Sequence, residues 1–153
     1  MKLKEVAAVK INPTAPFDFN STFHKPDHFT TGDNYWEPGT RWQTWAWQGI
    51  PLGLKFTLNK IDIWSENKLK DYFIDSLVTE IRYRYNLDLD LSDFYKQFSS
   101  DKVLGPIIKK WKGMRPGHPS SLYEYLIIGV VLQNATVRRS IQMFKSLLEN
   151  YGT

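Results

Sequence analysis

The chain has 153 residues, 42% hydrophobic and 24% charged, which is a globular composition and excludes collagen-like, mucin-like and wholly disordered chains. The absence of Cys excludes a disulfide framework, a thiolate zinc site, an iron–sulfur cluster and a Cys nucleophile, and it fits an intracellular location in the cytoplasm or nucleoid. The three His match no metal-site spacing, so we expect no metal and no cofactor. The longest apolar run, Leu126 to Leu132, is too short to span a bilayer, so we expect no membrane partner.

The charge is distributed unevenly along the chain. The net charge is +4, but residues 1–93 hold 11 basic and 13 acidic side chains, whereas residues 94–153 hold 9 basic and 3 acidic ones. A basic C-terminal third on a mildly acidic body indicates a polyanion as the partner of that third. The plainer interpretation is a solvated basic face with no partner.

The first part of the chain predicts an antiparallel sheet. Residues 1–11 alternate loosely and suit an edge strand, and residues 12–40 suggest loops with short strands. Apolar residues at every second position from 52 to 58 predict a strand with one buried face. Asn59-Lys60 then suggests a hairpin to a strand over residues 61–64.

A helical pattern replaces this alternation after residue 64. Ser65 is a predicted N-cap, and apolar residues at i, i+4 spacing predict an amphipathic helix of about five turns: Leu69, Phe73, Leu77 and Ile81. Two short helices are predicted over residues 92–97 and 101–111. The predicted fold class is therefore α+β, a small antiparallel β-sheet with a flanking helix followed by an all-helical part, with domains at 1–84 and 85–153.

Two further helices end the chain. Ser121 and Glu124 form a capping-box pattern before a helix that is apolar nearly all round, Leu122–Leu132, so we expect that helix to be buried on most sides. Thr136 is the predicted N-cap of a final helix that runs to Tyr151.

The junction between these two helices carries the candidate binding residues: Gln133, Asn134, Thr136, Arg138 and Arg139. Arginine in the first turn of a helix opposes the helix dipole, so local stability does not explain it. The free N–H groups of a helix N-terminus suit a phosphate, and Arg, Asn and Gln can pair with base edges. The alternative is that the side-chain amides hydrogen-bond to the free backbone groups at the helix end, while both arginine side chains extend into water.

Three segments in order resemble helix-hairpin-helix (HhH-GPD) DNA glycosylases. Residues 123–136 resemble the start of the glycosylase core, an apolar helix followed by a polar wedge loop, and the next helix ends in Tyr151-Gly152 as in that family. Upstream, residues 85–95 and Trp111-Lys-Gly-Met-Arg115 resemble segments of the 8-oxoguanine glycosylase branch. The resemblance covers residues 81–153 and extends loosely to the N-terminal sheet.

This resemblance implies the N-terminal part of a base-excision-repair glycosylase that binds damaged duplex DNA and flips the lesion base, with 8-oxoguanine as the lesion type. Asn134 falls where the family fills the gap left by the flipped nucleotide, and Arg139 where it reads the orphaned cytosine. Gln133 and Thr136 lie in the same wedge loop, Arg138 would hold phosphate, and Gly39 matches a glycine near the base pocket.

In family members the hairpin, the catalytic Asp and any lyase Lys follow the segment matched by Tyr151-Gly152. The resemblance therefore implies no catalytic residue in this chain and no activity of the chain alone. It also implies that the helix Leu122–Leu132 lacks part of its packing partner, so that an exposed apolar face would favour a dimer.

Two other functions stay open on the residues alone. The last two helices could form a helix-turn-helix in which Arg138, Arg139 and Gln142 enter the major groove of intact DNA. A protein-interaction domain without DNA binding is the other.

Two further clusters have a structural and a functional interpretation. The Trp residues at 42, 45 and 47 either stack bases, as in single-strand binders, or fill the core or cover the open face of the sheet. For Asp88, Asp90 and Asp93, helix capping and solvation are favoured over a metal site.

Overall fold

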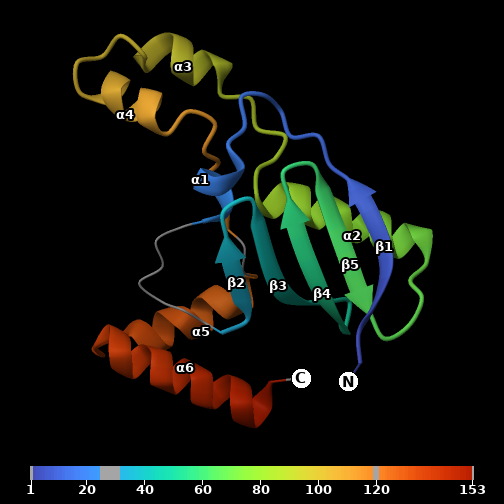
Figure 1. The fold of residues 1–153 in the computed structure, drawn as a ribbon. Coiled ribbons are helices and arrows are strands. Elements are labelled where there is room, and N and C mark those ends of the chain that lie inside the picture. The colour runs from blue at the N-terminus through green and yellow to red at the C-terminus, as the bar shows by residue number, and fades with distance from the viewer. Residues whose placement is uncertain (1, 25–31, 119–120, 153) are drawn as a thin grey trace.

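A computed structural model, which describes residues 2–24, 32–118 and 121–152, has a five-stranded antiparallel sheet in the order β1-β5-β4-β3-β2 (Figure 1). The strands are β1 Lys4–Lys10, β2 Asn34–Glu37, β3 Thr40–Trp47, β4 Ile50–Thr57 and β5 Lys60–Ser65. The predicted edge strand and the predicted hairpin between β4 and β5 are confirmed.

The alternation in β4 decides which side chains reach the core. Leu52, Leu54 and Phe56 are at most 1% exposed, and they point to one side because successive side chains of a strand alternate. The prediction for Leu58 is wrong, because the strand ends at Thr57 and Leu58 lies in the turn with 58% exposure.

One face of the sheet is covered by α2, Asp71–Arg84, which lies behind the strands in Figure 1. Its apolar stripe of Phe73, Leu77 and Ile81 is buried, as predicted. Ser65 is not the N-cap, because it pairs with Lys4 as the last residue of β5 and is buried. The helix begins six residues later and is correspondingly shorter than predicted.

A short helix, α1 Phe19–Phe23, lies in the segment expected to hold loops and short strands. Asp18 caps it by accepting a hydrogen bond from the Ser21 N–H at 2.7 Å. The Phe23 ring stacks on Tyr85 with 4.3 Å between centroids, so α1 joins the sheet core. Tyr85 and Leu87, just beyond the predicted boundary at residue 84, are buried in that core as well.

The helices α3 Ser92–Phe98 and α4 Leu104–Lys110 follow, at one end of the sheet (Figure 1). They match the two predicted short helices and contact each other. Neither contains a buried residue, so they contribute little to the core.

The last two helices, α5 Leu122–Leu132 and α6 Val137–Tyr151, lie side by side beyond the opposite end of the sheet (Figure 1). The prediction that α5 is buried on most sides is wrong for this structure. Val131 is its one buried residue, whereas Leu122, Leu126 and Val130 are at least 60% exposed. The apolar character predicted for this helix is present, but most of its apolar side chains are exposed.

The expected exposed apolar face is therefore present on α5, and a dimer through it stays a prediction. Over the described ranges, none of the helices has the length and apolar character needed to cross a membrane.

Candidate nucleic-acid interface

The predicted binding residues lie together at the turn between α5 and α6, which we call the wedge turn (residues 133–136). Gln133 closes α5, and its backbone N–H donates to the Val130 carbonyl at 3.2 Å. Asn134 follows with φ of 54°, a left-handed conformation that Asn adopts more readily than most residues. Both side chains are exposed. The turn therefore presents two amide side chains to solvent at the end of a helical hairpin.

Thr136 begins α6 as predicted. Its Oγ1 accepts a hydrogen bond from the Arg139 N–H at 3.3 Å, and its carbonyl accepts one from the Ser140 N–H at 2.9 Å. The first N–H groups of a helix have no partner within the helix, and this cap satisfies one of them. The N–H groups of Val137 and Arg138 lie at the same end, where an anion would meet them.

Arg138 and Arg139 are both exposed on the first turn of α6. Among the described residues, no ion pair involves either guanidinium. Arg139 also lies at one end of a shallow groove along α6, lined further on by Gln142, Ser146 and Asn150. The site thus combines two amides, two guanidinium groups and a helix N-terminus within seven residues, an arrangement suited to phosphates and base edges.

A residue that the sequence analysis missed fixes this turn. Ser140 is fully buried, and its Oγ donates a hydrogen bond to the Val131 carbonyl at 2.8 Å. That carbonyl belongs to the last turn of α5, where backbone acceptors lose their helical partners. The bond ties the first turn of α6 to the end of α5 and so holds the wedge turn. No sequence signal marks Ser140, because a serine on an amphipathic helix is ordinarily exposed.

The segment that resembles a glycosylase motif at residues 111–115 has a positioning role here. Gly113 has φ of +90°, and a Cβ on it would lie 2.7 Å from the Asp18 backbone nitrogen, so this close approach requires glycine. Arg115 is fully buried, its N–H donates to Thr22 Oγ1 at 3.1 Å, and its guanidinium donates to the Thr14 carbonyl. These contacts attach the connector before α5 to the N-terminal segment.

Gly39 does not join the wedge turn. It lies in the β2–β3 turn with φ of 81°, and its N–H donates to Asn20 Oδ1 of α1 at 2.8 Å. Figure 1 shows that turn beside α1, away from α5 and α6. Its place near a base pocket stays a prediction of the resemblance.

Local contacts account for two members of the acidic cluster, Asp88 and Asp90, and Asp93 lies in the first turn of α3. Asp88 pairs with the Arg82 guanidinium, and Asp90 accepts the Ser92 N–H at 2.8 Å. Hydrogen bonds from the Ser92 side chain and backbone hold the pKa of Asp90 below its usual value. Across the described ranges, no cluster of three or more His, Asp or Glu could hold a metal ion.

No protein-family model matches the chain, and no curated protein does. Solved structures do resemble it. A 3-methyladenine DNA glycosylase from Archaeoglobus fulgidus has a TM-score of 0.68 at 12% identity, over 95% of this chain and 50% of that one. MBOgg1 in complex with a low-affinity DNA ligand has a TM-score of 0.59 at 20% identity, over 100% of this chain and 50% of that one.

Both neighbours are glycosylases of the HhH-GPD superfamily, so the predicted resemblance is confirmed at the level of the fold. The α+β fold class is confirmed with it. The chain spans half the length of each neighbour.

Proposed function

We propose that this chain is the DNA-facing part of a base-excision-repair glycosylase and that its wedge turn enters damaged duplex DNA. The observation that carries the proposal is the exposed Asn134, which lies in a left-handed turn. Two arginines follow within five residues, and neither forms an ion pair with another described residue. A glycosylase-like fold around this turn supports the same interpretation.

Asn134 would occupy the gap that a flipped nucleotide leaves. Base flipping costs a few kcal/mol of stacking and pairing, and a polar side chain in the gap offsets part of that cost. The Ser140–Val131 hydrogen bond supports this role, because a turn that is already rigid loses less conformational entropy when its side chain is inserted into DNA.

The helix start after Thr136 would bind the backbone of the same duplex. The N–H groups of the first turn and the Arg138 guanidinium can hold a phosphate. Arg139 would read the base opposite the gap, because a guanidinium pairs with two acceptors at once. Gln133 would add a hydrogen bond to a neighbouring base edge or phosphate.

For the lesion we propose 8-oxoguanine. The support is the sequence resemblance of residues 85–95 and 111–115 to that branch, together with the position of Arg139, where that branch reads cytosine. The protein would act on DNA inside the cell.

The proposal is tested by the affinity of the purified chain for two labelled duplexes that differ at one position. One duplex carries an abasic-site analogue, which supplies the gap without the cost of flipping. We expect the abasic duplex to bind at least about tenfold more tightly, and both affinities to fall steeply as salt rises.

Three variants test which residues produce the difference in affinity between the two duplexes. Asn134→Gly keeps the left-handed turn and should remove the preference for the abasic duplex, and Arg139→Gln should weaken binding to both duplexes. Lys145→Gln is the matched control for Arg139→Gln, because both changes remove one positive charge from α6. Lys145 lies further along the helix, with its Nζ 3.6 Å from Glu149 Oε1. A preference for an intact sequence would instead favour the helix-turn-helix, and negligible binding at low salt would favour an interaction domain.

A further inference from the structure

We propose that the sheet carries a second nucleic-acid site, in which the bases of single-stranded DNA stack on Tyr35, Trp42 and Trp64. The site lies on the face of the sheet opposite α2, which we call the open face (Figure 1). It is separate from the wedge turn and does not depend on the function proposed above.

The strand register gathers these side chains. Tyr35 of β2 lies opposite Trp42 of β3, Trp42 lies opposite Lys55 of β4, and Lys55 lies opposite Asp62 of β5. All four therefore point to the same side of the sheet in one row. Trp64 stands on the same side, two residues along β5 from Asp62.

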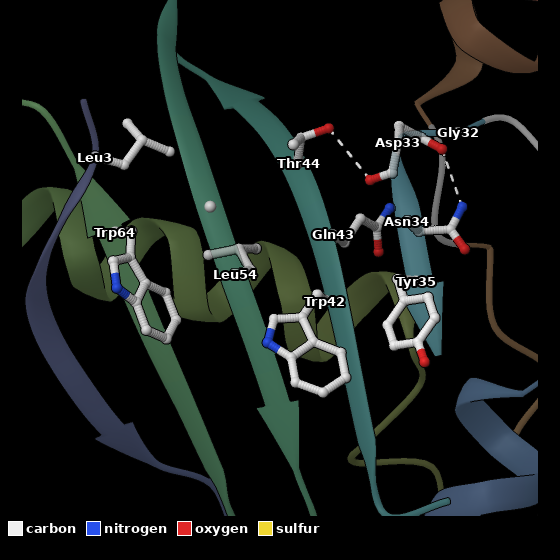
Figure 2. Close-up of a pocket in the computed structure, with 11 residues that line it drawn as sticks. Leu3, Gly32, Asp33, Asn34, Tyr35, Trp42, Gln43, Thr44, Leu54 and Trp64 are labelled. Carbon is white, nitrogen blue, oxygen red and sulfur yellow. Dashed lines mark hydrogen bonds between the residues drawn. The ribbon is translucent and has the colours of Figure 1, made fainter. Parts of the chain in front are cut away.

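A hollow of about 410 Å³ lies between the two tryptophans. Figure 2 shows Trp64 and Leu3 on one side of it and Trp42 and Tyr35 on the other. Gly53, directly opposite Trp64, leaves its floor without a side chain. A Cβ there would come within 3.3 Å of Leu3 Cδ1 and 3.4 Å of Trp64 Cβ. The volume falls in the range of small-molecule pockets, so it can admit a planar base.

The rings are placed for stacking with a ligand. Tyr35 is 63% exposed, and its ring centroid is 5.4 Å from that of Trp42 at an interplanar angle of 40°. Other tryptophans of the same segment are used differently. Trp45 is buried in the core, and Trp47 donates from Nε1 to Ser76 Oγ at 3.0 Å. Trp42 is half-buried on the open face, where both interpretations of the Trp-rich segment remain possible, and base stacking on it is part of this proposal.

The ammonium of Lys55 favours a phosphate over an apolar partner. Lys55 stands in the middle of the row, with its Nζ 5.5 Å from the Trp42 ring centroid. An apolar partner would desolvate this ammonium without compensation, whereas a phosphate would pair with it. The nearby Asp62 is paired with Lys60 at 2.8 Å, whereas Asp33 at the rim accepts a hydrogen bond from the neutral amide of Asn34 at 2.9 Å. Aromatic rings interleaved with a lysine are the arrangement that binds single strands without sequence preference.

Fluorescence anisotropy of a labelled oligothymidylate tests the site on the folded chain. Trp42→Leu should weaken binding roughly 5- to 100-fold, the loss expected for one stacked base. Lys55→Gln should weaken it less and flatten its salt dependence. Gly53→Val should also weaken it, because the added side chain would crowd Leu3 and Trp64 beside the hollow. Tyr35→Ser should weaken it without disturbing the core, because Tyr35 is exposed.

The matched control is the pair Lys70 and Tyr72 at the start of α2, on the covered side of the sheet. The Lys70 Nζ lies 5.8 Å from the Tyr72 ring centroid, and Tyr72 is 67% exposed. Tyr72→Ser should leave single-strand binding unchanged. Lys145→Gln, a charge change on α6 outside both proposed sites, should leave it unchanged as well.

Three results would overturn the proposal. The first is no measurable single-strand binding at low salt. The second is equal weakening by Tyr35→Ser and Tyr72→Ser, which would mean nonspecific attraction. The third is a concentration-dependent dimer that Tyr35→Ser dissociates, which would mean that a second copy of the chain covers the open face.

Discussion

Replacing Ser140 with alanine tests whether one buried hydrogen bond holds the wedge turn. Ser140 is fully buried, and its Oγ donates to the Val131 carbonyl at 2.8 Å. Alanine leaves that carbonyl without this donor, at a cost of about 1–3 kcal/mol. The higher helix propensity of alanine offsets roughly 0.5 kcal/mol of this cost. The expected net destabilisation of the hairpin is therefore about 0.5–2.5 kcal/mol.

The loss should be local. The helices α5 and α6 contact each other more than they contact the sheet, so they can open while the sheet stays folded. Native-state hydrogen exchange reports that opening amide by amide. We expect the protected amides of α5 and α6 to exchange about 2- to 70-fold faster in Ser140→Ala, which corresponds to about 0.5–2.5 kcal/mol.

Ser146→Ala is the control for helix propensity, because Ser146 lies on the same helix with its side chain exposed. In Ser146→Ala, the amides of α5 and α6 should exchange at the wild-type rate or more slowly. Unchanged exchange in Ser140→Ala would refute the role of the bond. Equal acceleration in the amides of β3 and β4 would refute the local nature of the opening.

Other substitutions test single features of the fold. Asn134→Ala should destabilise the hairpin by about 1 kcal/mol relative to Asn134→Gly, because the left-handed backbone disfavours a Cβ, and the same exchange measurement compares the two. Burial raises the pKa of Tyr85 from 10.0 to about 12, so its contribution to stability is complete below pH 10 and is lost as the pH rises toward 12. Denaturant unfolding should therefore depend less on pH over that range in Tyr85→Phe, which lacks the phenol and its hydrogen bond to Gln43. Gly39→Ala should lower the unfolding free energy by about 1 kcal/mol, because Gly39 has φ of +81° and no neighbour within 4 Å of an added Cβ; a larger loss in denaturant unfolding would mean that the turn contributes more than backbone strain.

Features set by local chemistry could be predicted from the sequence. The alternation of Leu52, Leu54 and Phe56 identifies a half-buried strand because the period of a strand is two. The capping box of Ser121 and Glu124 is present with both of its hydrogen bonds. Both signals depend on neighbours within a few residues, and at these positions the rest of the fold agrees with them.

Features set by distant contacts could not be predicted. Ser65 has the residue type of an N-cap, but pairing with β1 extends the strand through it. The left-handed turn at Asn134 and the burial of Ser140 depend on how α5 meets α6. Arg115 has a charged side chain and is nevertheless fully buried, and its hydrogen bonds reach residues about a hundred positions earlier in the chain.

The central claim is that Asn134 enters the duplex at a gap, and site-directed crosslinking tests it most directly. The chain has no cysteine, so Asn134→Cys carries a photoreactive label at one position. We expect crosslinks to an abasic duplex at the abasic nucleotide and its opposite base, and none at these positions from a label at Glu149→Cys, at the far end of α6. Crosslinks from position 134 that spread evenly along the duplex, or that match those from position 149, would contradict the account.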